Sequence, residues 1–210
     1  MTPAAVALLA AMGVSLTVFV AMRVRMGALS KPLAPPRGSA AAGVLYAFTV
    51  AFAPWAKESA SRHLPSYLAG IAYHLALFAS IARLVVSLFG TPLPSIADRA
   101  IAVVVAPGLA CGVALLLKRC LDGRLRAISV PEDFFANALV DAVLAAALAT
   151  TLAPRALPVF QSLGVLLFLY APLGKLRHMV FLFTSRRALG ATFGRRGVRP
   201  APNPGGARRG

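Results

Sequence analysis

The stretch PSYLAGIAYHLALFASIARLVVSLFG, Pro65–Gly90, decides the fold class of this chain. A helix that crosses the hydrocarbon core of a bilayer needs about 20 predominantly apolar residues. This stretch is longer than that, and His74 and Arg83 are its only basic residues. Its apolar residues do not alternate with polar ones, as they would in a barrel strand. The stretch therefore predicts a membrane-spanning helix.

Four further apolar segments have the length and composition of membrane spans. Hydrophobic residues make up 59% of the 210 residues and charged residues only 13%, with a mean hydropathy of +0.76. A chain of this composition belongs in a membrane. The further spans are predicted at Pro3–Met22, Ala100–Leu117, Phe134–Ala153 and Ala156–Thr184. We predict an all-α integral membrane helix bundle of about five transmembrane helices.

A sixth apolar run, Ser39–Ala56, is ambiguous because it is short and prolines flank it on both sides. The distribution of Lys and Arg separates the alternatives, since basic residues gather on the cytosolic side of a membrane. If the run does not cross the bilayer, 19 basic residues lie inside against 2 outside; if it crosses, the counts are 15 and 6. The charge pattern therefore favours an interfacial or re-entrant helix over a sixth span.

The same charge pattern predicts the location and organisation of the chain. We expect a multi-pass protein of the cytoplasmic (inner) membrane, with its N-terminus outside and its C-terminus in the cytosol. No basic segment precedes the first helix, so we expect that helix to be retained. The net charge of +16 is assigned to loops that meet the lipid bilayer, and not to nucleic acid. The predicted divisions are a first helix with a basic loop (1–38), a membrane bundle (39–193) and a disordered basic tail (194–210).

Two histidines, His74 and His178, lie inside predicted spans, and the chain has only one other, His63. Ionisable groups within a membrane are costly and often mark functional sites. At 1.5 Å per residue, His74 lies about 15 Å and His178 about 10 Å from the predicted cytosolic edge. Two imidazoles at similar depth can ligate one haem iron from both faces. His63 is expected at the membrane edge, with a hydrogen bond to a haem propionate or a quinone as the alternative.

Residues beside the two histidines suit a haem. Gly70, one turn before His74, leaves room for the flat macrocycle. Lys175 and Arg177 can reach haem propionates or lipid phosphate. Pro172 removes one helical hydrogen bond and should bend the last predicted helix.

The remaining reactive side chains are sparse. Cys111 and Cys120 form neither a CxxC nor a CxxCH motif, so any haem is expected to be non-covalent haem b. Any iron–sulfur cluster would belong to a partner. Asp141, in an otherwise apolar helix, either relays protons or pairs with a hydroxyl or with Arg83.

Three stretches carry a resemblance to a known family: YLAGIAYHLALF (Tyr67–Phe78), LLLKRCLDGRLRAISVPEDF (Leu115–Phe134) and APLGKLRH (Ala171–His178). From about residue 57 to residue 197 the chain resembles the gamma (membrane cytochrome b) subunit of respiratory nitrate reductases. It is similar as well to the relatives of that subunit in sulfite-reduction and heterodisulfide-reductase-like complexes. The resemblance implies that His74 and His178 ligate the haem nearer to a cytosolic partner.

The chain also departs from that family. Members hold a second haem near the outer face with two further histidines, and the matching positions here are Leu84 and a stretch around Phe160. Neither can ligate iron. The resemblance therefore implies one haem b, and the family's outer quinol site would lack its neighbouring haem.

Two classes of function follow. In the first, the chain is the haem-b subunit of a respiratory redox complex that passes electrons between membrane quinone and a cytosolic iron–sulfur subunit. In the second, it is a haem-free membrane anchor or scaffold whose histidines only pack.

Overall fold

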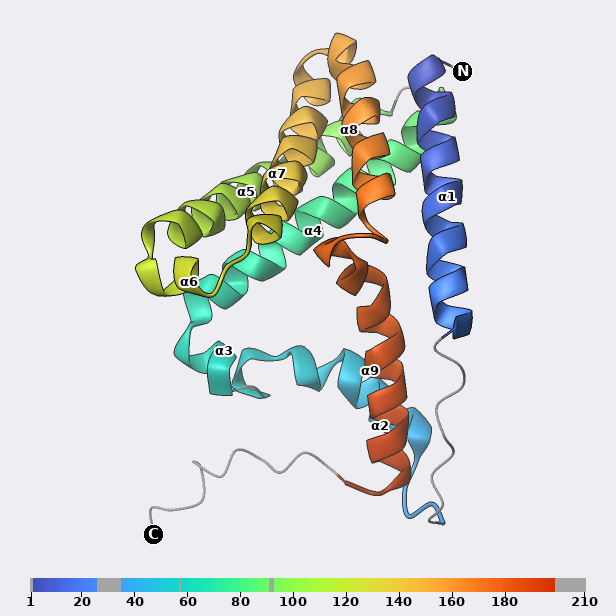
Figure 1. The fold of residues 1–210 in the computed structure, drawn as a ribbon, viewed down its shortest axis with the longest axis vertical. Coiled ribbons are helices and arrows are strands. Elements are labelled where there is room, and N and C mark those ends of the chain that lie inside the picture. Colours follow the sequence, from blue (N-terminus) through green and yellow to red (C-terminus); the bar gives the residue numbers. More distant parts are fainter. Residues whose placement is uncertain (1, 26–34, 57, 91–92, 199–210) are drawn as a thin grey trace. The chain divides into compact units, whose positions relative to one another are not determined.

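The computed structural model describes residues 2–25, 35–56, 58–90 and 93–198, and every regular element within them is a helix (Figure 1). The predicted all-α fold is confirmed. The chain divides into two compact units, which are described separately. The first unit comprises Met1–Met22 and Leu68–Arg177, and the second comprises Arg23–Tyr67 and His178–Gly210.

The α-helices vary widely in length, and short 3₁₀ turns connect several of them. The α-helices are α1 (Pro3–Arg25), α2 (Ala40–Phe48), α3 (Glu58–Arg62), α4 (Leu64–Ser87), α5 (Ser95–Leu121), α6 (Gly123–Ala127), α7 (Pro131–Leu152), α8 (Leu157–Tyr170) and α9 (His178–Arg195). The 3₁₀ turns are η1 (Val50–Phe52), η2 (Pro54–Ala56), η3 (Pro154–Ala156) and η4 (Lys175–Arg177).

Four helices, α1, α4, α5 and α7, are long and apolar enough to cross a membrane. They match four of the five predicted spans, and local capping explains some of their ends. At the start of α7, the Asp133 carboxylate accepts a hydrogen bond from the Val130 backbone N–H at 3.0 Å. Pro131, the first residue of the helix, has no backbone N–H and so leaves no unpaired donor there. After α5, the Asp122 carboxylate accepts the Arg124 backbone N–H at 2.9 Å and begins α6.

The fifth predicted span, Ala156–Thr184, is not one continuous helix. α8 ends at Tyr170, and the chain turns through residues 171–174 before η4 and α9. Pro172 has no N–H for the helical ladder, and a Cβ on Gly174 would overlap the Tyr170 ring. The sequence predicted a bend at Pro172, whereas the structure has a full break. The two halves together account for at most one further span.

The core of the first unit forms around α7, which packs against both α5 and α8. Leu8 of α1 and Leu84 of α4 are fully buried and lie against Gly164 of α8. Large apolar side chains on the outer faces of α1 and α5 are exposed, among them Leu16 and Val103. Such faces suit contact with lipid chains, which need no polar partner.

The sixth apolar run, Ser39–Ala56, forms the short α2 followed by η1 and η2. The nine residues of α2 are too few to cross a bilayer, which needs about 20. Ser39 caps this helix by accepting the Ala42 backbone N–H at 3.3 Å. The run therefore has the length expected of an interfacial or re-entrant segment.

In the second unit, α2 packs against α9 at very short range. A Cβ on Gly190 would lie 2.7 Å from the Gly43 carbonyl oxygen, and one on Gly194 would lie 2.9 Å from the Gly43 Cα. Glycine is needed at this crossing because the two backbones touch. The predicted basic tail starts at Gly194, which is still part of α9, and its residues 199–210 lie outside the described chain.

Candidate functional site

The His74 imidazole is held in one orientation by its own helix. Its Nδ1 lies 2.6 Å from the Gly70 carbonyl oxygen. A carbonyl can only accept, so Nδ1 carries the proton, and the lone pair is on Nε2. The Tyr73 ring meets the imidazole edge-on, with 6.3 Å between ring centroids. A histidine whose Nδ1–H donates to a carbonyl is the usual arrangement of a metal-ligating imidazole.

The flank beside His74 is open at Gly70. A Cβ on Gly70 would have no heavy atom within 4 Å among the described residues, and the His74 side chain is exposed. The glycine is therefore not required by packing within the described chain. This open flank fits the predicted room for a macrocycle.

His178 is the first residue of α9 and belongs to the second unit, whereas His74 belongs to the first. The side chains of His178 and of the preceding Arg177 are exposed. The expected position of His178 inside a continuous helix was wrong, because the chain breaks at residues 171–174 and the helix restarts at this residue. The pairing of the two histidines on one iron stays a prediction.

Lys175, the other predicted propionate partner, is tied to the start of α7. Its Nζ lies 2.6 Å from the Asp133 carboxylate, and its backbone N–H donates to the Glu132 carboxylate at 2.8 Å. The Tyr170 hydroxyl donates to the same Glu132 oxygen at 3.2 Å. These contacts hold the break between α8 and α9 against α7.

Asp141 is buried and lies in a polar cluster with Asn137 and Tyr73, which are half-buried. The Asn137 amide donates to the Asp141 carboxylate at 2.9 Å and to the Tyr73 hydroxyl at 3.2 Å. That hydroxyl in turn donates to the Asn137 carbonyl at 3.1 Å. Gly112 of α5 leaves space here, since a Cβ on it would overlap both Asp141 and the Tyr73 ring. The cluster thus reaches the residue that precedes His74.

Arg83 does not pair with Asp141. Its guanidinium forms an ion pair with Asp98 in the first turn of α5. Leu84 and Phe160, at the positions that match the family's outer haem ligands, are fully buried apolar side chains. Both side chains pack in the core of the first unit, where members of the resembled family would hold the outer haem.

The third histidine, His63, and the two cysteines are distant from one another in the sequence. His63 is exposed in the turn between α3 and α4, where its backbone N–H donates to the Ala60 carbonyl at 3.3 Å. Cys111 and Cys120 are not in a disulfide. Among the described residues no group of three or more His, Cys, Asp or Glu side chains could hold a metal ion, and a two-histidine haem site does not require such a group.

Sequence reasoning missed three features of this region. The Asn137 and Tyr73 partners of Asp141 lie 64 residues apart, so no local pattern indicates their contact. The hydrogen bonds from Tyr170 and Lys175 to Glu132, which hold the break between α8 and α9, also join residues that are far apart in the sequence. The glycine crossing did leave a signal, because Gly190 and Gly194 form a GxxxG motif.

No protein-family model, curated protein or solved structure matches the chain.

Proposed function

We propose that this chain is the haem-b subunit of a membrane redox complex and passes electrons between membrane quinone and a cytosolic iron–sulfur subunit. One observation carries the proposal: an imidazole at His74, oriented through Nδ1 by the Gly70 carbonyl, stands beside a flank that is open at Gly70. The family resemblance of the three quoted stretches supports the same function and adds His178 as the second ligand.

Each residue would have a distinct role. His74 and His178 would hold the haem iron, and Gly70 would leave space for the macrocycle. Arg177 is the better partner for a propionate, because the Lys175 ammonium is already paired with Asp133. A haem held by these residues would supply one-electron redox chemistry.

The partner is proposed from charge. Arg124 and Arg126 are exposed on α6, within the loop predicted to face the cytosol. An acidic face on an iron–sulfur subunit would complement these cations and would be steered toward them. The quinone follows from the family resemblance.

Single histidine substitutions test this function. His74→Ala and His178→Ala each remove a proposed axial nitrogen, so the purified variants should lose haem or give a high-spin spectrum in place of the low-spin spectrum. His63→Ala is the matched control, because it also removes a histidine, but from an exposed turn about 16 Å along the helix from His74. Circular dichroism shows that each variant is helical before its reduced-minus-oxidised spectrum is read.

The anchor alternative gives a different result. If the wild-type protein, produced with haem supplied, has no haem spectrum, the chain is a haem-free scaffold. Loss of the spectrum in His63→Ala with retention in His178→Ala would show that the ligand pair is assigned wrongly.

A further inference from the structure

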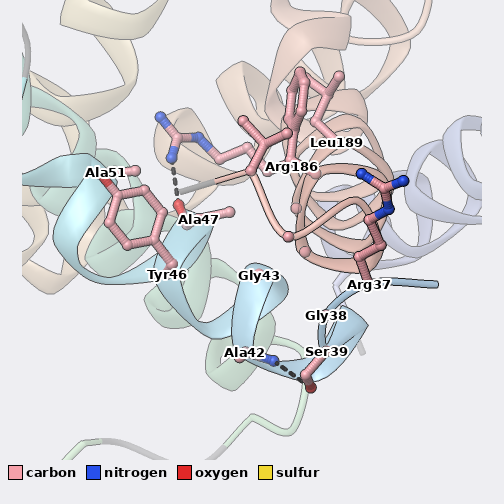
Figure 2. A pocket seen from close by; sticks show the side chains of 15 residues that line it. Arg37, Gly38, Ser39, Ala42, Gly43, Tyr46, Ala47, Ala51, Arg186 and Leu189 are labelled. Atoms are coloured by element: carbon pink, nitrogen blue, oxygen red, sulfur yellow. Dashed lines mark hydrogen bonds between the residues drawn. The ribbon is translucent and has the colours of Figure 1, made fainter. Parts of the chain in front are cut away.

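The second unit contains a large pocket between α9 and the segment that runs from Arg37 into α2 (Figure 2). Its volume is about 1000 Å³, which is at the upper end of the range for small-molecule sites. The walls are mostly apolar and include Ala42, Leu189 and Phe193. The glycine crossing of α2 and α9 forms part of the same wall.

Two arginines, Arg37 and Arg186, line this mostly apolar pocket, and Ser39 and Tyr46 are its other polar residues among those described. Arg186 is already engaged: its guanidinium donates to the Ala47 carbonyl, as Figure 2 shows, and lies 3.8 Å from the centre of the Phe52 ring. Arg37 is fixed by its backbone N–H, which donates to the Arg195 carbonyl at 2.8 Å. Within the described residues its guanidinium makes no hydrogen bond or ion pair with the protein.

The charge of the second unit indicates what the pocket takes. By sequence this unit carries 13 Lys and Arg residues and one acid, Glu58. Among the residues that the structure describes, no acidic side chain lines the pocket. A guanidinium beside a long apolar wall matches an amphiphile with an anionic head, whereas a neutral quinone would leave the arginine charge unmatched.

We propose that this pocket binds one anionic phospholipid, with its phosphate on Arg37 and an acyl chain along Leu189 and Phe193. The planar guanidinium donates two parallel hydrogen bonds to phosphate oxygens. The apolar wall takes up the chain in place of bulk lipid. The proposed lipid site uses no haem ligand, so its test does not depend on whether the chain binds haem.

The test measures lipid binding to the full-length protein in detergent by native mass spectrometry, with phosphatidylglycerol and phosphatidylcholine as probes. Arg37→Gln should lower the affinity for phosphatidylglycerol about tenfold, as expected for one lost charge-assisted pair. Arg187→Gln is the matched control, because it removes the same charge from the same unit at an exposed position outside the pocket. It should change the affinity less than about twofold.

A second variant keeps every charge and fills the space instead. Ala42→Trp should also weaken phosphatidylglycerol binding while leaving helix content unchanged. Equal losses in Arg37→Gln and Arg187→Gln would overturn the proposal in favour of diffuse surface charge. Equal wild-type affinity for the two lipids would overturn it as well, and so would complete displacement by millimolar inorganic phosphate. If Ala42→Trp abolishes binding of a soluble quinone analogue but not of phosphatidylglycerol, the pocket is a quinone site.

Discussion

Gly70 allows the haem proposal to be tested without disturbing the rest of the chain. Outside its own helix backbone, a Cβ added there meets no described heavy atom within 4 Å, and the carbonyl of residue 70 can still accept from His74. Gly70→Leu should therefore leave the thermal unfolding midpoint of the haem-free protein unchanged or slightly raised, because leucine favours a helix over glycine. It should nevertheless reduce haem retention, since the leucine fills the space left for the macrocycle. The absorbance ratio of haem to protein after purification measures this effect.

Gly112 provides the opposite case within the same unit. A Cβ there overlaps Asp141 and the Tyr73 ring, so Gly112→Leu should lower the unfolding midpoint through overpacking. A Gly70→Leu protein that unfolds as early as Gly112→Leu would show that Gly70 is structural. Normal haem content in Gly70→Leu would show that the open flank is not the haem face.

The crossing of α2 and α9 depends on backbone contact. Gly190→Leu inserts a side chain where a Cβ already lies 2.7 Å from the Gly43 carbonyl oxygen. It should destabilise this contact by about 1–3 kcal/mol and expose the Arg37 peptide bond to trypsin. The rate of cleavage in the folded protein measures the effect. Gly13→Leu is the control, because no described atom lies within 4 Å of a Cβ at that helical position.

A cleavage rate in Gly190→Leu that equals the rate in Gly13→Leu would contradict the close packing of the two helices. Faster cleavage in Gly190→Leu alone would support it. Both variants make the same substitution inside a helix, so helix propensity cancels between them.

The elements that could be predicted from sequence are those decided by local composition. α1, α4, α5 and α7 follow from apolar length alone. The full break before His178 was missed because Pro172 alone predicts only a bend, and the further contacts there, Gly174 against Tyr170 and Lys175 on the distant Glu132, are not visible in the sequence. Asp141 was singled out as an ionisable residue in an apolar helix, and its side chain is buried. Its neighbour Asn137 follows from the four-residue spacing on α7, whereas Tyr73 of α4 comes from tertiary packing, which no periodicity encodes.

For the molecule as a whole, the chain combines two kinds of surface. Apolar side chains cover the outer faces of long helices in the first unit, and the second unit carries most of the basic residues. A multi-pass membrane protein is the architecture that accounts for both. Within it, only His74 and His178 are proposed to bind iron, so the whole molecule should hold one haem.

Pyridine haemochrome quantitation of the purified full-length protein tests this claim most directly. About one haem b per polypeptide is expected, because His74 and His178 together would hold one iron. A value near zero in protein produced with haem supplied would contradict a one-haem subunit and favour a haem-free membrane anchor. A value near two would contradict it in the other direction, because it would require ligands beyond His74 and His178.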